Sequence, residues 1–321
     1  MNTRVWRKLT FAGAVVSMTM AVPAFAQTGP LQPATPPASA DDPTPAPPST
    51  AQAPAGSVSG MGDINLYPKR VVIDDHNRVA SIGLYNRTTN TGDYDITLSD
   101  MMMMADGRLV DLASVTDPAQ HAKVHGASAL LRYSPHRVTL PGSQSQMVRI
   151  MAHVPPDLPP GEYRAHFAAI AIPPEDTGLS IQQATGQSQA SGIGVHIVPR
   201  FGISIPVIVR IGETTLNVGL TDVVLATLPD GSHGIAFTIT REGTRSAFGD
   251  IAITAAGVKT PLLQAKGLGV YTELAARQVK LAFDPKAPPG AFAPGTRLTI
   301  TYTDDDVSPG KVLARQEFTV P

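Results

Sequence analysis

The most regular alternation of apolar and polar positions in the chain runs over residues 193–209. Its even positions are mostly small, polar or charged, whereas its odd positions are all apolar: Ile193, Val195, Ile197, Pro199, Phe201, Ile203, Ile205, Val207 and Val209. Successive side chains of a β-strand point to opposite faces, so this period of two predicts a strand with one apolar face. The run is unusually long, because a typical strand has about 5–6 residues.

Two prolines in this run bear on where the strand lies in its sheet. Pro199 and Pro206 have no backbone N–H, which favours a sheet edge or a strand bent between two partners. A long edge strand is open to aggregation unless a partner covers it. Two interpretations follow: the apolar face fills the core of its own domain, or the strand completes a partner fold by β-augmentation. The second assigns as donor residues Ile193, Val195, Ile197, Phe201, Ile203, Ile205 and Val207.

Shorter runs of the same period, separated by turn signals, continue from residue 63 to the C-terminus. The first group is 80–84, 94–98, 138–140, 148–150 and 163–172. The second group is 215–225, 234–241, 249–255, 279–283, 298–303 and 312–320. No long stretch has a helical period, so the pattern predicts an all-β chain with two immunoglobulin-like β-sandwiches. We place the N-terminal domain at 61–211 and the C-terminal domain at 212–321.

The first 60 residues have a different composition and lack the alternating pattern. Three basic residues within the first eight precede an apolar stretch from 9 to about 22, and a small-x-small pattern ends at Ala26. This predicts a signal peptide over 1–26, cleaved after Ala26, and export to the periplasm. The alternative is a transmembrane anchor, which would need about 20 apolar residues. Residues 27–60 are rich in Pro, Ala, Ser and Thr, which predicts a disordered linker.

Composition narrows the classes of function. The formal net charge is −1, and removing the signal, with three basic residues and no acid, takes it to −4. Without a Lys/Arg cluster, binding to nucleic acid is not expected. The chain has no cysteine, which excludes disulfides, thiol redox chemistry and thiolate metal sites. It has neither a Gly-x-Ser-x-Gly elbow nor a Gly-rich phosphate loop after a strand. We therefore expect no enzyme and no cofactor.

Arg70 lies in the segment 69–75 (KRVVIDD), an expected strand that leads into a turn. A guanidinium presents a planar fork of donors that suits a carboxylate. Arg70 is therefore a candidate for binding the terminal carboxylate of a partner. The alternative is a solvated arginine at a strand edge.

Two further features raise the question of a metal site. Residues 101–104 are four consecutive methionines, and thioethers are soft ligands for copper(I). In a strand, however, only alternate residues share a face, and flexible apolar packing is the alternative. His121 and His125 have the spacing of ligands on a helix, but no third ligand lies at a suitable spacing. We predict no metal site.

Several segments, taken in order, resemble the periplasmic chaperones of bacterial pilus assembly. Segment 69–75 is similar to that family's N-terminal strand, with an arginine, apolar residues and a turn. Segments 133–142 (YSPHRVTLPG) and 146–150 (QMVRI) are similar to its Pro-rich segment, Pro-Gly turn and Arg-containing strand, and 172–174 (IPP) to its Ile-Pro-Pro element. The alternating run at 193–209 takes the place of the family's donor strand. The resemblance covers about 63–210 well and the C-terminal part in outline.

The resemblance implies that the first of two immunoglobulin-like domains donates its last strand to a pilin that lacks one. It also implies that an arginine and a lysine between the domains bind the pilin's terminal carboxylate. Two departures mark a divergent relative. No lysine occurs between 193 and 210, where Arg200 is the substitute that we assign and Pro206 is the other candidate for the matching position. Segment 161–167 (GEYRAHF) replaces the aromatic-Leu-Asn pattern of the family.

Together, these observations predict a periplasmic chaperone for pilus or fimbrial subunits, with Arg70 and Arg200 binding the subunit carboxylate. The expected partners are pilin-like subunits and an outer-membrane usher, with no nucleic acid and no transmembrane segment in the mature chain. The alternative is a structural or adhesive immunoglobulin-like protein at the cell surface, with the linker as a stalk and no chaperone activity.

Overall fold

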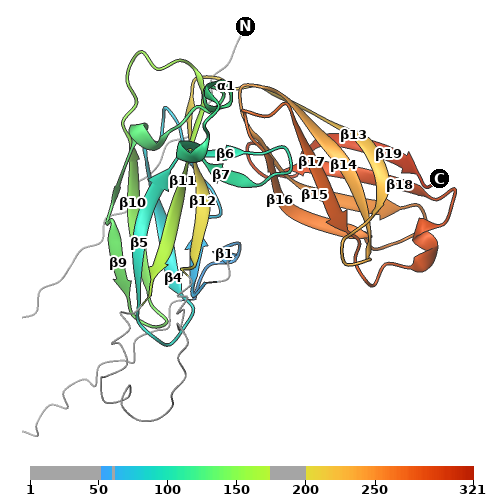
Figure 1. Cartoon of the computed structure of the whole chain (residues 1–321), viewed down its shortest axis with the longest axis horizontal. Coiled ribbons are helices and arrows are strands. Elements are labelled where there is room, and N and C mark those ends of the chain that lie inside the picture. The colour runs from blue at the N-terminus through green and yellow to red at the C-terminus, as the bar shows by residue number, and fades with distance from the viewer. Residues whose placement is uncertain (1–51, 60–61, 174–199) are drawn as a thin grey trace, which may run out of the picture. The chain divides into compact units, whose positions relative to one another are not determined.

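The computed structural model describes residues 52–59, 62–173 and 200–321, all within one compact unit, Ser49–Pro321. The predicted signal peptide, most of the predicted linker and the donor residues Ile193, Val195 and Ile197 lie outside the described residues. Strands dominate the described part (Figure 1). No helix in these ranges is long and apolar enough to cross a membrane.

The first sandwich consists of two five-stranded sheets. One sheet has the order β1-β2-β4-β10-β8, with bounds β1 Val58–Ser59, β2 Ile64–Tyr67, β4 Val79–Asn86, β10 Ser145–Ala152 and β8 Leu131–Ser134. The other has the order β3-β12-β11-β5-β9, with bounds β3 Val71–Ile73, β12 Gly202–Ile211, β11 Gly161–Ile172, β5 Gly92–Ser99 and β9 Arg137–Leu140. Neighbouring strands are antiparallel except β3, which runs parallel to β12.

The core of this sandwich follows from the period of two. Ile82 and Leu84 on β4 and Val148 and Ile150 on β10 are fully buried, and the register places Ile82 opposite Val148. Phe167 on β11 faces them from the other sheet within the same cluster. Burying a large apolar side chain contributes about 1.5–3 kcal/mol relative to exposure, so this double layer is the main source of stability.

A hairpin and three short helical turns connect β5 to β8. The hairpin is β6 Met101–Met103 with β7 Leu109–Asp111, followed by η1 Leu112–Ser114, α1 Pro118–His121 and η2 Ser128–Leu130. Asp117 caps α1 by accepting a hydrogen bond from the Ala119 N–H at 2.9 Å. The hairpin turn contains Asp106 and Gly107, and Gly107 has a φ of 87° that favours glycine.

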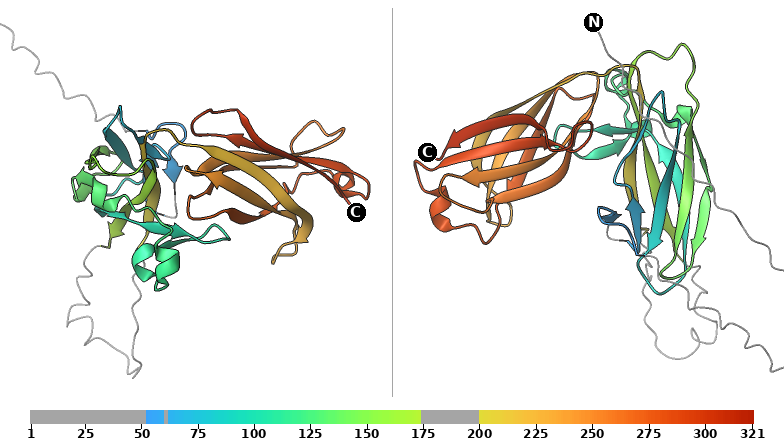
Figure 2. Two further views of the ribbon diagram at one scale, coloured as in Figure 1. Left: turned by 90° about the horizontal axis from the view of Figure 1, so that it is seen from above. Right: turned by 180° about the vertical axis from the view of Figure 1, so that it is seen from behind.

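The second sandwich consists of a three-stranded and a four-stranded sheet (Figure 2). The first has the order β13-β14-β17, with bounds β13 Leu216–Thr227, β14 His233–Gly243 and β17 Ala276–Ala282. The second has the order β16-β15-β18-β19, with bounds β16 Leu263–Val270, β15 Ala247–Ala255, β18 Arg297–Asp304 and β19 Val312–Thr319. A short turn, η3 Pro289–Phe292, precedes β18.

The predicted fold class, all-β with two immunoglobulin-like sandwiches, is confirmed by this architecture. Several details differ from the sequence expectation, which lacked β2, β7 and β8. Residues 58–59, which we assigned to the disordered linker, form β1 because Val58 pairs with Leu66 and packs against the first core. β16 was not predicted, since its glycines interrupt the apolar alternation.

Candidate functional site

Among the described strands, one edge of β12 is paired along its whole length, and the other edge, here called the open edge, is paired over three residues only. β11 pairs with it from Gly202 to Ile211, whereas β3 pairs only with Val207–Val209 on the other side. The Phe201 carbonyl accepts a hydrogen bond from the Ala171 N–H at 2.8 Å, so the odd-numbered residues of this strand direct their backbone groups toward β11. Even-numbered residues therefore direct theirs to the opposite edge. Within the described ranges, no strand pairs with Gly202 or Ser204 on that edge.

Pro206 fits this arrangement. It has even parity, so the position of its missing N–H falls on the side of β12 that β11 does not use. The proline interrupts no hydrogen bond of the β11 ladder. Because Pro206 has no N–H, a strand added to the open edge would receive no hydrogen bond from β12 at this residue, which limits an uninterrupted ladder to the residues up to Ser204.

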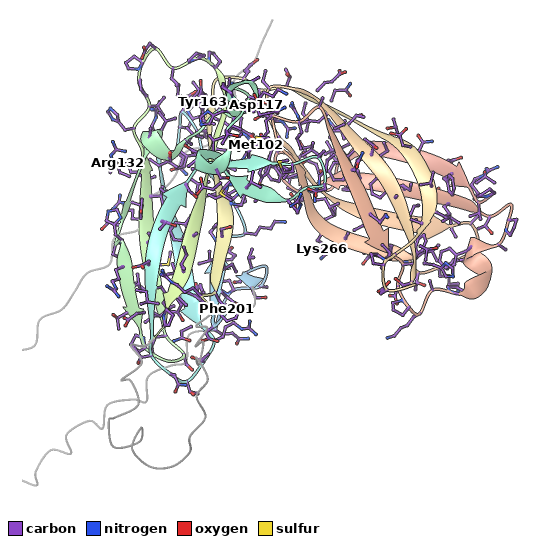
Figure 3. The ribbon with its side chains drawn as sticks, in the orientation of Figure 1. Met102, Asp117, Arg132, Tyr163, Phe201 and Lys266 are labelled. Atoms are coloured by element: carbon purple, nitrogen blue, oxygen red, sulfur yellow. The ribbon has the colours of Figure 1, made fainter. Side chains whose placement is uncertain are left out.

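Four of the predicted donor residues fall on described positions. Ile203, Ile205 and Val207 are 8%, 1% and 0% exposed and belong to the core of the first sandwich. Phe201 is different, because it is 42% exposed. It lies at the opposite end of the first sandwich from Tyr163 (Figure 3). The described strand therefore presents an open backbone edge and one exposed aromatic side chain, and its other odd-numbered side chains fill its own core.

Arg70 lies just before β3 and contacts the second sandwich. Its Nη2 donates to Asp305 Oδ1 and to the Asp305 carbonyl, both at 2.9 Å. Its Nε lies 3.7 Å from Asp306 Oδ1, and its guanidinium lies 4.2 Å from the ring centroid of Phe248. Arg70 is thus bound to carboxylates, as its guanidinium chemistry suggests, but these carboxylates belong to its own chain.

A cleft of about 840 Å³ opens beside Arg70. Pro206 of β12 lines it, and so do four cationic side chains, Lys69, Arg70, Lys266 and Arg277. Asp250 is the one acidic residue that also lines it. The open edge of β12 and a positively charged cleft therefore meet at Pro206.

Arg200 is not brought near Arg70. Its Nη2 lies 3.2 Å from Asp95 Oδ2, and its Nε donates to the Ala171 carbonyl. Arg70 directly precedes Val71, which pairs with Val207. Val207 lies seven residues after Arg200, and at a rise of ~3.3 Å per residue this separation amounts to roughly 23 Å along the strand. The two arginines that we assigned to one carboxylate are thus well separated, with Arg70 beside the middle of β12 and Arg200 before its first residue, and their part in binding stays a prediction.

A second charged cluster lies behind the cleft. Arg164 Nη2 donates to both carboxylate oxygens of Glu273, at 2.8 and 2.9 Å, and both side chains are almost fully buried. The Arg164 guanidinium also stacks over Tyr271 at 3.5 Å, and Glu273 accepts a hydrogen bond from the Met103 N–H. Since buried charges are stable only when paired, this cluster ties β11 and β6 to the β16–β17 connection.

His166 is buried beside this cluster. Its Nε2 lies 3.1 Å from the Tyr271 hydroxyl. Burial, with a smaller contribution from the Arg164 charge, lowers the pKa of His166 to about 3. Burial also raises the pKa of Tyr271 to about 12. Both side chains are therefore neutral near pH 7, and His166 is a core residue.

A third cluster joins the sandwiches near the end of β12. Arg210 Nε donates to Glu162 Oε2 at 3.0 Å, and Arg210 Nη2 donates to Asp306. Glu162 in turn accepts a hydrogen bond from the Ser246 hydroxyl. Arg245 lies 3.8 Å from the same Asp306 carboxylate.

The methionine and histidine motifs find structural roles. Met103 packs with Ile208, Phe248 and Tyr271, whereas Met102 packs with Leu112 and Val124. Opposite faces of the β6 strand thus enter two apolar clusters. His125 stacks on Tyr163 with ring centroids 5.5 Å apart. Within the described ranges, no group of three or more His, Cys, Asp or Glu side chains is arranged to hold a metal.

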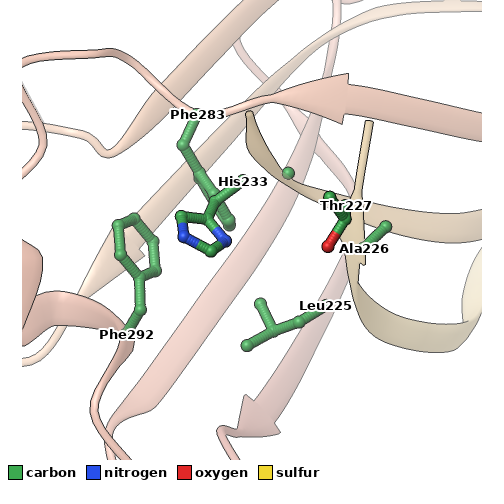
Figure 4. Close-up of a pocket in the computed structure, with 7 residues that line it drawn as sticks. Leu225, Ala226, Thr227, His233, Phe283 and Phe292 are labelled. Carbon is green, nitrogen blue, oxygen red and sulfur yellow. The ribbon is translucent and has the colours of Figure 1, made fainter. Parts of the chain in front are cut away.

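A smaller hollow of about 370 Å³ lies in the second sandwich (Figure 4). His233 and the rings of Phe283 and Phe292 line it, with the two ring centroids 4.4 Å apart. Thr227 is a further polar residue in its lining. The hollow has no charged wall comparable to that of the β12 cleft.

The sequence interpretation missed the acidic residues of the site. Asp304, Asp305 and Asp306 form a run of three that begins at the last residue of β18 and leads toward β19, here called the acidic turn. The run was visible as a local charge cluster, but its contact with Arg70 spans 235 positions in the sequence. Glu162 and Glu273 gave no local signal at all.

No family model matches the sequence, and no curated protein matches it. Among solved structures, the Pseudomonas aeruginosa CupB2 chaperone is 10% identical with a TM-score of 0.38, covering 80% of this chain and 100% of that chain. The Acinetobacter baumannii CsuC–CsuE chaperone–tip adhesion subunit complex is 11% identical with a TM-score of 0.41, and the match covers 80% of this chain and 98% of that chain. The Salmonella enterica SafA pilin–SafB chaperone complex is 11% identical with a TM-score of 0.38, and the match covers 82% of this chain and 98% of that chain. Residue roles do not transfer at these identities and follow here from the geometry of β12 and Arg70.

Proposed function

We propose that the chain is a periplasmic chaperone that holds pilus or fimbrial subunits during assembly. In this proposal the terminal strand of a subunit adds to the open edge of β12, and Arg70 binds the terminal carboxylate of that strand. Export with cleavage after Ala26, and delivery to an outer-membrane usher, belong to the same proposal.

The observation that carries the proposal is the open edge of β12 beside a cationic cleft. Gly202 and Ser204 direct their backbone groups away from β11, where β3 does not reach. Such an edge accepts an added strand through main-chain hydrogen bonds, which is the general mode of β-augmentation. The exposed ring of Phe201 offers an apolar contact at the far end of this edge.

In this proposal the direction of the added strand follows from the position of Arg70. A strand that covers 202–206 and ends at Arg70 runs in the same direction as β12. It is therefore parallel to β12, as β3 is, and it ends where β3 begins. The subunit strand and β3 would then follow one another along the same edge.

The cleft supplies the charge that a terminal carboxylate requires. Arg70 and Lys69 are closest to the end of the open edge, and Lys266 and Arg277 line the same cleft. A carboxylate with charge-assisted hydrogen bonds from arginine is bound more strongly than a neutral group. This chemistry favours a chain terminus over an internal segment of the subunit.

The direct test is a proline at the open edge. Ser204→Pro removes the one N–H that the proposed subunit strand uses near the middle of the edge, and leaves the β11 ladder intact. The full chain is co-expressed with pilin-like subunits encoded in the same genome, and bound subunit is recovered from the periplasm. We expect Ser204→Pro to lose the subunit and the control Ser204→Thr, which keeps the N–H, to retain it.

Equal recovery with both variants would contradict strand addition at this edge. Fractionation of the same cells then decides on the alternative role. A chain found at the cell surface, without a bound subunit, would favour a structural or adhesive protein.

A further inference from the structure

Asp305 occupies the position at Arg70 that the proposed function reserves for a subunit carboxylate. Its Oδ1 accepts a hydrogen bond from Arg70 Nη2 at 2.9 Å, and its Oδ2 accepts one from Lys69 Nζ. One carboxylate thus bridges both cations at the end of the open edge of β12. Its side chain is 11% exposed, and that of Lys69 is 46% exposed.

The acidic turn holds the backbone of Asp305 in place independently of these ion pairs. The Asp304 carboxylate accepts hydrogen bonds from the Asp306 N–H at 2.9 Å and the Ser308 N–H at 3.0 Å. The Asp305 N–H donates to the Phe248 carbonyl at 3.1 Å. The Asp305 side chain can therefore leave the two cations by rotation, without unfolding the turn.

Arg70 keeps other partners when Asp305 turns away. The Asp305 carbonyl still accepts from Nη2, Asp306 Oδ1 lies 3.7 Å from Nε, and Phe248 covers the guanidinium face. The cation is therefore held in position for a second carboxylate. Burial works to raise the pKa of Asp305, but hydrogen bonds from Lys69 and Arg70 outweigh it and keep the pKa below its usual value.

We propose that Asp305 is an internal competitor that occupies the carboxylate site until the terminal carboxylate of a subunit displaces it. The inference rests on the proposed function, because it adds a regulatory step to the same site. A terminus without a charge cannot replace Asp305 at two cations, so the exchange selects for a free carboxylate. It also keeps Lys69 and Arg70 paired while no subunit is bound.

The test measures binding of two synthetic peptides to the full chain by titration calorimetry. Both have the same alternating apolar sequence; one ends in a free carboxylate and the other in an amide. Asp305→Asn keeps the shape of the side chain and removes its charge. We expect it to tighten binding of the acid peptide about fivefold, which is the scale of one partly exposed ion pair, and to leave the amide unchanged.

Asp250→Asn is the matched control, because it removes one negative charge from the lining of the cleft beside Arg70. Asp250 accepts a hydrogen bond from the Gly267 N–H, whereas the carboxylates bound to Arg70 are those of Asp305 and Asp306. We expect its effect on the acid peptide to be much smaller than that of Asp305→Asn. If both variants gain the same affinity for the acid peptide, the proposal that Asp305 is a competitor is wrong, and the gain reflects only the overall charge near the cleft.

Arg70→Ala separates this inference from the proposed function. If it weakens the acid peptide while Asp305→Asn also weakens it, Asp305 helps to position Arg70 and the competitor is wrong, although the carboxylate site stands. If Arg70→Ala changes nothing, the carboxylate site itself fails. Thermal melts of each variant establish that the protein is folded, and Asp305→Ser provides a second removal of the charge.

Discussion

Arg164 and Glu273 form an ion pair that solvent scarcely reaches, with side chains 2% and 1% exposed. Arg108 and Asp106 form another at the hairpin turn, with side chains 74% and 51% exposed. Water already solvates the second pair, so its net contribution is small. Separation of the first pair instead leaves one charge buried without a counterion, which is costly.

This contrast gives a prediction for stability. Glu273→Ala should lower the free energy of unfolding by about 3–5 kcal/mol, because it leaves the Arg164 guanidinium buried without its carboxylate. Denaturant titration followed by circular dichroism measures the change. Asp106→Ala is the control and should have little effect. A loss as small as that of the control would mean that water enters beside Arg164.

His166 gives a prediction for pH dependence. Its pKa of about 3 in the folded protein lies below the ordinary value of 6.5, so the unfolded chain takes up a proton first as the pH falls. The stabilisation is complete above about pH 6.5 and is lost as the pH falls from there toward 3, at about 1.4 kcal/mol for each unit.

His166→Gln removes this titration. Denaturant unfolding at a series of pH values should therefore give a flatter curve for the variant than for the natural chain between pH 6.5 and 4. The carboxyl groups titrate in both proteins, so their contributions cancel in the difference between the two curves. Parallel curves would show that His166 takes up a proton as readily in the folded protein as in the unfolded chain.

At the level of single residues, the sequence did not reveal which carboxylates Arg70 binds. Arg70 was assigned to the terminal carboxylate of a partner from the donor geometry of guanidinium, which stays a prediction, and in the structure it binds carboxylates of its own chain. Which carboxylates they are depends on the approach of the acidic turn, more than two hundred positions away. Arg200 was paired with Arg70 as the substitute for the lysine that the resemblance implies, but that assignment carries no information on the distance between the two side chains.

The sequence predicted those strands in which apolar and polar positions alternate with a period of two. β9 and the first half of β12 follow the alternation of two, because each has one core-facing side and one exposed side. The pattern fails where a strand is covered on both faces. Ile208 has the polar parity of β12, yet it is buried against Met103, Phe248 and Tyr271. Its burial depends on side chains from other elements, which alternation within the strand cannot reveal.

Burial along β12 gives a prediction at the scale of the element. Ile205→Ala should lower the free energy of unfolding by about 2–5 kcal/mol, since the side chain is fully buried and its removal leaves a cavity. Phe201→Ala should change it by less than about 1 kcal/mol because the ring is largely exposed. Denaturant titration measures both. Similar losses would place Phe201 in a packed environment.

The same contrast separates folding from binding on β12. A charge at Ile203 or Ile205 would disrupt the first core, so loss of a subunit in such a variant would not identify a binding surface. Phe201 and Ser204 lie outside that core, and changes at these two positions report on the open edge itself.

At the scale of the molecule, charged side chains connect the two sandwiches. Arg70 bonds to Asp305, Arg164 to Glu273, and Arg210 to Asp306. Hydrophobic alternation predicted each sandwich separately, because each core is built from its own strands. The connections between them depend on isolated charges that have no periodic pattern, so alternation along the chain predicts none of them.

Asp306 provides the test of this coupling, because it meets Arg210, Arg245 and Arg70 at once. Asp306→Ala should cost about 2–3 kcal/mol, the scale of hydrogen bonds to a charged group, since Arg210 keeps Glu162 as its remaining partner. The loss falls on contacts between the sandwiches and spares both cores. Differential scanning calorimetry should therefore show the unfolding transition broaden or separate into two.

Asp95→Ala is the control for that experiment, because it breaks the exposed pair with Arg200 inside the first sandwich. It should leave the shape of the transition unchanged. If Asp306→Ala shifts the melting temperature and the transition stays as narrow as in the control, the sandwiches are coupled mainly by apolar contacts. The packing of Met103 and Ile208 against Phe248 would then be the stronger connection.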